Sequence, residues 1–283
     1  MKIGLDHYSY HRYFGDIYGA HGDPGETWTL EDFIDHIRTL PYECAAFETC
    51  FLPPSKRELM NAVRKLDREV SFAWGHPHGF MEVSEEAAIA EIEKYLRLSR
   101  DFGGQVLRIA GSSIAYFNQP HRPQIDLTLR RLEKILPLAE KYQVRLAIEN
   151  HGDFFLPELE EILITLDTDF LGMTLDTGNL LRFKEDPVEA IHKLGSKIYL
   201  VHAKDLAPMG GFSPNDPLRL ACVPAGRGIT DFPGIFRMLK SQNYQGMVLI
   251  EISGVHPDFA EVHETDMIRE GLLYLLSLRE QPQ

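Results

Sequence analysis

Short apolar runs alternate along the chain with longer segments whose apolar residues recur at helical spacing. Phe33, Ile34 and Ile37 mark one helical segment, and Leu129 and Leu132 lie on the apolar stripe of another. The apolar runs cover residues 3–5, 44–48, 70–74, 106–110, 144–148, 171–175, 198–201 and 247–250. Strands that alternate with helices form a parallel sheet, and eight of them close most naturally into a barrel. The pattern therefore predicts an α/β fold, a (β/α)8 TIM barrel.

Residues at the ends of these segments agree with that alternation. Ser55, with Glu58 three residues later, forms a capping-box pattern at the start of one helix. Asp186-Pro187 opens another helix, which Gly195 ends. The competing fold is an open doubly wound sheet, but no GxGxxG motif follows an early strand. Residues 204–230 show no periodicity, so we expect a long irregular loop after the seventh strand.

Length and charge narrow the functional classes. The 283 residues suit a single barrel domain that spans residues 1–283. A formal net charge of -13 disfavours nucleic acid and anionic membrane surfaces as partners, because both need a positive surface. Residues 1–10 lack the apolar core of a signal peptide, and no apolar run approaches the ~20 residues of a membrane span. We expect a cytoplasmic protein with a small-molecule partner. Whether the chain forms a homo-oligomer stays open.

The last four predicted strands each end in a residue that can bind a metal ion. In chain order these residues are Glu149, Asp176, His202 and Glu251. The strands of a barrel point their carboxyl ends at one face, so residues far apart in sequence meet there. Taken alone, Asp176 before Thr177-Gly178 suits a turn, and His202 suits a core histidine. Their occurrence at four successive strand ends favours a shared metal site.

The chemistry of this set points to a hard divalent cation. Three carboxylates and one imidazole suit Mn²⁺ or Mg²⁺, tolerate Co²⁺ and are less typical of structural zinc. We expect Mn²⁺ in the first place. Four protein ligands leave two positions open on an octahedral ion, where a carbonyl and a neighbouring hydroxyl of a substrate could bind. The cation would then stabilise the enediolate that forms when a proton is lost beside a carbonyl.

Further polar residues lie near other predicted strand ends. His7, His76, His78 and His151 each fall at or near one, so we expect them to line a substrate pocket. Arg108 lies inside the fourth apolar run. We expect it to point into the rim of the barrel or to pair with a carboxylate.

The motifs around the four candidate ligands resemble those of the xylose-isomerase-like TIM barrels. They are Ile148-Glu149-Asn150, Leu175-Asp176-Thr177-Gly178-Asn179, Val201-His202-Ala203-Lys204-Asp205 and Ile250-Glu251. The segment Gly226-Arg227-Gly228-Ile229-Thr230-Asp231-Phe232 resembles the family's approach to its last pair of helices. More narrowly, the set resembles the sugar phosphate isomerase/epimerase group, which includes the ketose 3-epimerases. The resemblance implies a metal-dependent isomerase or epimerase that acts on a sugar.

The resemblance also implies roles for individual residues. In ketose 3-epimerases the two metal-bound glutamates form the acid/base pair, which here would be Glu149 and Glu251 on opposite faces of one substrate carbon. Inversion needs two such groups, because a single base returns the proton to the side it came from. Asp176 and His202 would anchor the metal. Arg219 is the nearest match to the family's arginine that holds the substrate carbonyl, and a solvated loop arginine is the alternative interpretation.

Two positions leave the exact activity open. Asn179 stands where the ketose 3-epimerases commonly carry a histidine, at a place expected to face the substrate. Lys204 is either a cation near the substrate or only a partner of Asp205. The same family contains dehydratases, lyases of oxidised glycosides and isomerases, which all abstract a proton beside a carbonyl. The alternative activity is therefore a metal-dependent dehydratase or lyase of a keto sugar, an inosose or an oxidised glycoside.

Two other functional classes receive less support. The related apurinic endonucleases use a three-zinc cluster that needs a histidine where Asn179 stands and an Asp-x-His in the loop after His202, which residues 204–230 lack. The acidic charge also argues against DNA as a substrate. A non-catalytic sugar-binding barrel would not need both Glu149 and Glu251.

Overall fold

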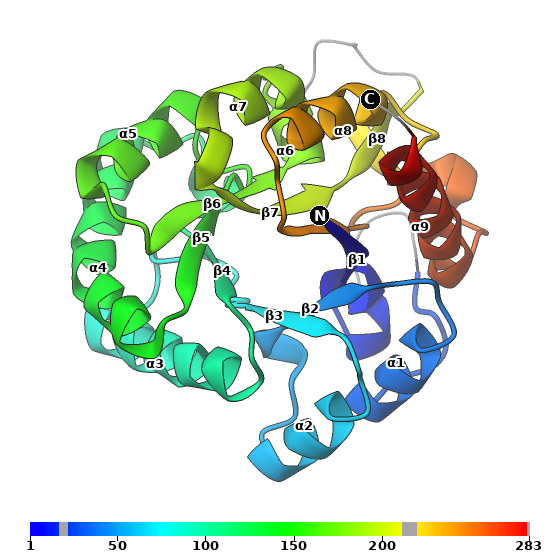
Figure 1. Cartoon of the computed structure of the whole chain (residues 1–283), viewed down its shortest axis with the longest axis horizontal. Coiled ribbons are helices and arrows are strands. Elements are labelled where there is room, and N and C mark those ends of the chain that lie inside the picture. The colour runs from blue at the N-terminus through cyan, green and yellow to red at the C-terminus, as the bar shows by residue number, and fades with distance from the viewer. Residues whose placement is uncertain (17–21, 211–219, 282–283) are drawn as a thin grey trace.

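Eight parallel strands close into a barrel in the computed structural model, which describes residues 1–16, 22–210 and 220–281. The order around the wall is β1-β10-β7-β6-β5-β4-β3-β2, so the last strand pairs with the first (Figure 1). The barrel strands are β1 Lys2–Asp6, β2 Cys44–Glu48, β3 Glu69–Ala73, β4 Val106–Ala110, β5 Arg145–Glu149, β6 Leu171–Asp176, β7 Ile198–Ala203 and β10 Met247–Ile250. The predicted TIM barrel is confirmed.

Helices form a ring outside the strands (Figure 1). The helix α1, for example, buries an apolar stripe that contains Phe33, Ile34 and Ile37. None of the described helices is long and apolar enough to cross a bilayer. The helices are α1 Leu30–Ile37, α2 Lys56–Val63, α3 Glu85–Asp101, α4 His121–Tyr142, α5 Leu156–Leu166, α6 Thr177–Arg182, α7 Pro187–Leu194, α8 Phe232–Ser241 and α9 Glu264–Glu280.

Among the features that were not predicted are a short helix and a pair of strands. The helix α6 follows β6 directly, because the Asp176 carboxylate accepts the backbone N–H of Asn179 at 2.8 Å and caps it. The strands β8 (Asp205–Pro208) and β9 (Leu220–Val223) pair antiparallel beside the barrel. The expectation of a wholly irregular loop at residues 204–230 was therefore wrong. This pair is short and lacks clear alternation of polar and apolar residues, so no periodicity revealed it.

Alternate residues of the strands fill the interior of the barrel. Ala46, Ala147, Leu200 and Leu249 belong to a buried cluster there to which β2, β4, β5, β7 and β10 contribute. Side chains alternate between the two faces of a strand, so residues two positions further on point the same way. On these strands they include Glu48, Arg108, Glu149, His202 and Glu251. Small and apolar residues thus form the floor beneath a charged layer at the carboxyl ends of the strands.

Asp205, the first residue of β8, organises the loop that leads to α8. Its Oδ2 accepts the N–H groups of Gly226 and Gly228, both at 2.8 Å, and its Oδ1 accepts the N–H of Thr230 at 3.1 Å. A Cβ on residue 228 would overlap Asp205 Oδ1. The close approach of backbone to carboxylate explains why glycine stands at this position of the Gly226–Thr230 motif.

His7 begins the 3₁₀-helix η1 (His7–Phe14) directly after β1, and its ring is buried among aromatic side chains. The ring stacks on Phe33 with centroids 4.1 Å apart and meets Phe14 and Phe51 edge to face. Within the described residues neither ring nitrogen has a hydrogen-bond partner. Burial lowers the pKa of His7 to about 3, so the ring stays neutral in the folded protein near pH 7.

We predict that Gly228→Ala lowers the free energy of unfolding by about 1–3 kcal/mol, because the added methyl group displaces Asp205 and weakens its bonds to the loop. Urea unfolding monitored by circular dichroism measures the change. Gly210→Ala is the matched control, since a Cβ at residue 210 would meet no atom within 4 Å. Equal stability of the two variants would contradict the role given to Asp205.

We also predict that His7 makes the fold less stable in acid. The unfolded chain binds a proton at His7 near pH ~6.5, whereas the folded chain does so only near about 3, so stability falls as the pH is lowered through this window. From pH 7 to pH 5 the wild type should lose about 2 kcal/mol more stability than His7→Phe. Urea unfolding of both proteins at the two pH values measures this difference. An identical pH dependence would show that His7 is not buried in its neutral form.

Candidate active site

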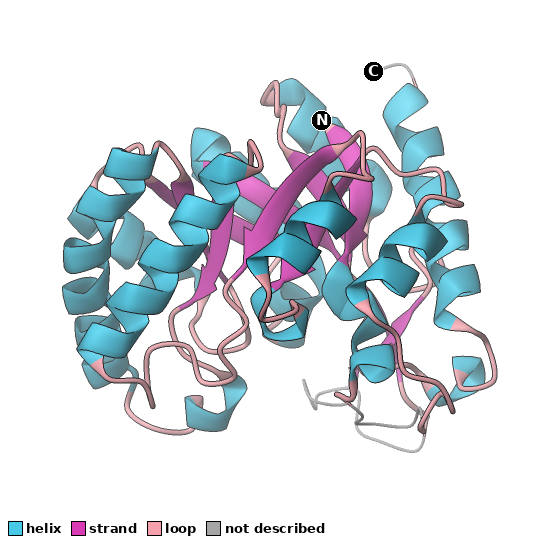
Figure 2. Cartoon of the chain, turned by 90° about the horizontal axis from the view of Figure 1, so that it is seen from below, coloured by secondary structure: helices cyan, strands magenta, loops and turns pink. Residues whose placement is uncertain are grey.

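The four predicted ligand residues meet at the carboxyl end of the barrel. This is the end of the molecule that carries the loops following the strands, opposite the N-terminus in Figure 2. One potential ligand atom of each residue lies within 4.8 Å of the others, and all four side chains are buried. The set comprises Glu149 from β5, Asp176 from β6, His202 from β7 and Glu251, which follows β10. The spatial grouping expected from the strand ends is present.

Protein cations hold the three carboxylates of this group in place. Arg108 on β4 donates from Nε to Glu149 Oε2, so the pairing expected for this arginine is confirmed. Lys204 lies between two carboxylates, with Nζ 2.6 Å from Asp176 Oδ2 and 2.8 Å from Glu251 Oε1. Buried charges are stable only when they are paired, and these contacts supply the pairs.

His202 lies between carboxylates on both sides of its ring. Its Nδ1 is 2.5 Å from Glu251 Oε2 and 3.5 Å from Glu149 Oε1. Its Nε2 is 3.6 Å from Asp6 Oδ2, at the end of β1. None of these atoms forms a contact with hydrogen-bond geometry, although each is buried. Three donor atoms, from His202, Glu149 and Glu251, therefore face one another without a hydrogen-bond partner within the described residues.

The charges around the two glutamates keep both ionised. Burial by itself raises the pKa of Glu149, but the positive charges of Arg108 and His202 outweigh it and hold the pKa well below its usual range. The pKa of Glu251 is lowered in the same way, because Lys204 and His202 offset its burial. Both side chains can therefore act as anionic ligands or as bases.

In two other buried carboxyl groups of this charged layer, burial outweighs the neighbouring positive charge, and the pKa is raised. Burial raises the pKa of Asp176 to about 6, and the charge of Lys204 offsets only part of that rise. Burial also raises the pKa of Glu48 to about 8, although Arg108 Nη1 lies 3.4 Å from its Oε1. Buried carboxyl groups are thus crowded at this end of the barrel, and a divalent cation bound there would favour their ionised forms.

The residues present fit a hard divalent cation. The group offers carboxylate oxygens and one imidazole nitrogen, the donors that Mn²⁺, Mg²⁺ and Co²⁺ accept. The unpartnered atoms Glu149 Oε1, Glu251 Oε2 and His202 Nδ1 would gain a partner from such an ion. The structure describes no second cluster of this kind in residues 1–16, 22–210 and 220–281. A possible divalent-metal site therefore lies where the sequence predicts it.

The predicted histidines of the pocket lie at different distances from this group. His151 follows β5 and is half-buried, and its buried Nδ1 has no hydrogen-bond partner within the described residues. Burial lowers the pKa of His151, and the charges of the site also act on it. His76 stacks on Trp74, with centroids 5.2 Å apart, and is half-buried. His78 lies beside Glu82, with Nε2 3.5 Å from its Oε2. His7 is enclosed by aromatic rings as described above. The predicted contacts of these four histidines with a substrate stay predictions.

Three other predicted residues have distinct positions. Asn179 donates its side-chain amide to the backbone oxygen of Asn150 at 3.0 Å, so it supports the loop after β5. Lys204 contacts Asp176 and Glu251, and the alternative that it only pairs with Asp205 was wrong, since Asp205 binds backbone N–H groups. Arg219 lies outside the described residues.

Asp6 and Glu48 belong to the charged layer, but we did not predict them. Asp6 is fully buried at the end of β1, and Glu48 is buried at the end of β2. Both lie at the carboxyl ends of early strands, so the rule that identified Glu149 and Glu251 applied to them as well. The sequence also offered a second signal. Asp6 and Glu48 lie two positions after the small residues Gly4 and Ala46, and therefore on the same face of their strands.

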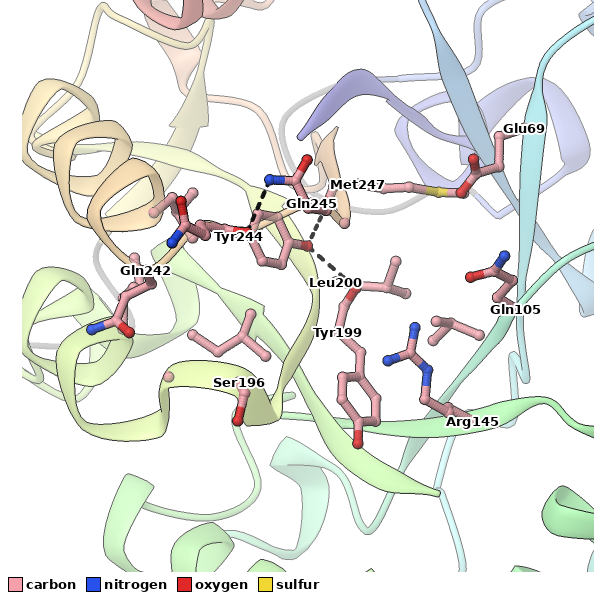
Figure 3. A pocket seen from close by; sticks show the side chains of 17 residues that line it. Glu69, Gln105, Arg145, Ser196, Tyr199, Leu200, Gln242, Tyr244, Gln245 and Met247 are labelled. Atoms are coloured by element: carbon pink, nitrogen blue, oxygen red, sulfur yellow. Dashed lines mark hydrogen bonds between the residues drawn. The ribbon is translucent and has the colours of Figure 1, made fainter. Parts of the chain in front are cut away.

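A cavity of about 300 Å³ lies at the opposite end of the barrel (Figure 3). Its lining includes Glu69, Arg145 and Met247, the first residues of β3, β5 and β10. Arg145 lies over the ring of Tyr199, 4.4 Å from its centroid. Active sites of TIM barrels lie at the carboxyl ends of the strands, so this cavity is not the candidate active site.

Comparisons with known proteins agree with the fold. The model of the xylose isomerase-like TIM barrel family matches residues 34–278. An inosose dehydratase of Clostridium botulinum is 24% identical over 261 residues, which cover 79% of this chain and 86% of that protein. The putative L-ribulose-5-phosphate 3-epimerase SgbU of Escherichia coli is 32% identical over 178 residues, which cover 60% of this chain and 59% of that protein.

Solved structures show the same architecture. The apo form of the 3-keto-D-glucoside 4-epimerase YcjR from E. coli superposes with a TM-score of 0.73 at 16% identity, covering 98% of this chain and 99% of that one. At this identity the similarity concerns the fold alone. The family match, in contrast, extends over most of the chain and includes the strands that carry all four candidate ligands. The chain therefore belongs to the xylose isomerase-like TIM barrel family.

Proposed function

We propose that this protein is a divalent-metal-dependent sugar isomerase or epimerase that removes a proton beside a carbonyl and forms an enediolate. The observation that carries the proposal is the convergence of Glu149, Asp176, His202 and Glu251 within 4.8 Å. Relatives in the family act on sugars and inososes according to their names, which supports a keto sugar as substrate. The acidic chain suits a small cytoplasmic metabolite better than a polyanion.

The position of the two glutamates suits proton transfer. Glu149 ends β5 and Glu251 follows β10, and β7 and β6 separate these strands in the barrel wall. The two carboxylates therefore approach the common centre from different directions. One would accept the proton from a substrate carbon and release it to solvent, and the other, after taking up a proton from solvent, would donate it to the opposite face. Inversion at that carbon would follow.

A bound cation, preferably Mn²⁺, would supply electrophilic stabilisation of the negative charge that develops on the substrate oxygens. The chain's own residues would do the rest. Arg108 keeps Glu149 ionised and oriented, and Lys204 does the same for Glu251. Asp176 and His202 complete the ligand set. The charged side chains lie on a packed apolar floor, which would close the site on the side away from the loops.

Charge balance favours a neutral substrate. Within the described part of the chain the layer holds two permanent cations, Arg108 and Lys204, and both already contact carboxylates. Buried carboxyls outnumber them, and they are Asp6, Glu48, Glu149, Asp176 and Glu251. Because Arg108 and Lys204 are already engaged, neither is free to bind a phosphate group brought close to this layer. A keto sugar without a phosphate at its reacting end therefore fits better.

The second candidate is a dehydratase or lyase on the same site. Inosose dehydratases align with about four fifths of the chain, a longer match than that of the epimerase relative SgbU. Elimination begins with the same proton abstraction, and a hydroxyl group then leaves from the neighbouring carbon. The products separate the two activities, because an epimerase conserves the mass of its substrate whereas a dehydratase releases water.

We predict that Glu149→Gln and Glu251→Gln each lower turnover by about 10²–10⁴-fold, because each removes a proton acceptor from the site. Rates are measured on whichever ketose, inosose or keto-glycoside the wild type converts, and circular dichroism checks the fold. Glu69→Gln, at the opposite end of the barrel, is the matched control and should retain full activity. Near wild-type turnover in either active-site variant would refute the two-base mechanism.

We predict that chelation of divalent cations abolishes turnover and that Mn²⁺, Mg²⁺ or Co²⁺ restores it at one ion per chain. The anionic donor set binds such ions, and the reaction needs their charge. Metal analysis and activity assays on the same samples measure the effect. Full activity of a metal-free preparation would exclude the proposed mechanism.

A further inference from the structure

Asp6 ends β1 with a fully buried carboxylate that is only half engaged. Its Oδ1 accepts the backbone N–H of Tyr8 at 2.7 Å and caps η1. Its Oδ2 is buried and has no hydrogen-bond partner within the described residues. Capping a short helix needs one oxygen, so this role does not account for the second oxygen or for the cost of burying the charge.

The second oxygen faces the candidate metal site. Asp6 Oδ2 lies 3.6 Å from Nε2 of His202, whereas Glu149 and Glu251 contact the other ring nitrogen. Nδ1 of the same ring is the nitrogen that points at those two carboxylates. The two nitrogens of His202 thus face different partners, one the ligand group and the other Asp6.

A histidine that binds a metal through one nitrogen carries its proton on the other, and a carboxylate that accepts this proton fixes the tautomer and the orientation of the ring. We propose that Asp6 is a positioning residue that accepts the Nε2–H of His202 and thereby presents Nδ1 to the metal. This inference rests on the metal site of the proposed function. Oδ2 and Nε2 are 3.6 Å apart, which is longer than a hydrogen bond, so the proposal requires the two atoms to approach each other when the metal binds.

The substitution Asp6→Asn separates this role from capping. Asparagine keeps the oxygen that accepts the N–H of Tyr8, but its amide group can place N–H donors opposite Nε2–H. We expect Mn²⁺ and Zn²⁺ to bind about 10–100-fold more weakly to this variant, measured by competition with a chelator. Thermal unfolding in excess chelator should be close to that of the wild type, because the cap is retained.

A second readout follows the proton itself. In the Zn²⁺-loaded wild type with ¹⁵N-labelled histidine, we expect one imidazole, absent in His202→Gln, whose Nε2–H exchanges slowly with water. In Asp6→Asn this signal should exchange faster or vanish. Asp153→Asn is the matched control, since Asp153 is equally buried and, among the described residues, accepts the backbone N–H groups of Ser112, His151 and Phe154. It should bind metal within about twofold of the wild type.

The outcomes distinguish this inference from the proposed function. If the wild type binds Mn²⁺ and Glu251→Gln weakens binding, while Asp6→Asn binds as tightly as the wild type, the positioning role is wrong and the metal site stands. If Asp6→Asn and Asp153→Asn lose affinity equally, the effect is general and the positioning role is also wrong. If the wild type itself binds no divalent cation, the proposed function and this inference fall together.

Discussion

The structure depends on burying several carboxylates at one end of a barrel. Charges of one sign cannot share a buried layer unless opposite charges are placed among them. Arg108 and Lys204 supply part of this compensation, and each contacts two carboxylates. Within the described residues, atoms of Glu149, Glu251 and His202 still lack a hydrogen-bond partner and face one another, so one more positive charge bound there would stabilise them. A divalent cation satisfies this requirement, and the chemistry of the protein follows from it.

The surrounding loops support that layer. Lys204 lies in the segment that joins β7 to β8, and the next residue, Asp205, binds three backbone N–H groups of the loop before α8. The hydroxyl of Thr177 donates to the backbone oxygen of Lys204 at 2.8 Å, which links the start of α6 to the same segment. The motif from His202 to Asp205 therefore combines a metal-capable residue, a buried cation and a loop anchor. Each residue has a separate physical task.

The sequence predicted those parts that follow from periodicity and from the rule of strand ends. The eight strands, the barrel and the group of Glu149, Asp176, His202 and Glu251 all came from local patterns that the closed parallel sheet then brings together. Other parts depend on geometry that no local pattern encodes. Lys204 pairs with Asp176 rather than with Asp205, and Asn179 forms a hydrogen bond to the loop after β5. Both contacts depend on which groups lie near the side chain in the folded protein. The pair β8 and β9 is likewise stabilised by its position beside the barrel rather than by its own pattern.

The central claim is that this site removes a proton beside a carbonyl. Incorporation of deuterium from heavy water tests it most directly, with Mn²⁺ present and with ketoses, inososes and keto-glycosides as candidate substrates. The account predicts deuterium at the one carbon beside the carbonyl, in an epimer, an isomer or a dehydrated product that identifies the activity. Conversion of a substrate without deuterium in the product or in the recovered substrate, or no exchange at all despite bound metal, would contradict it.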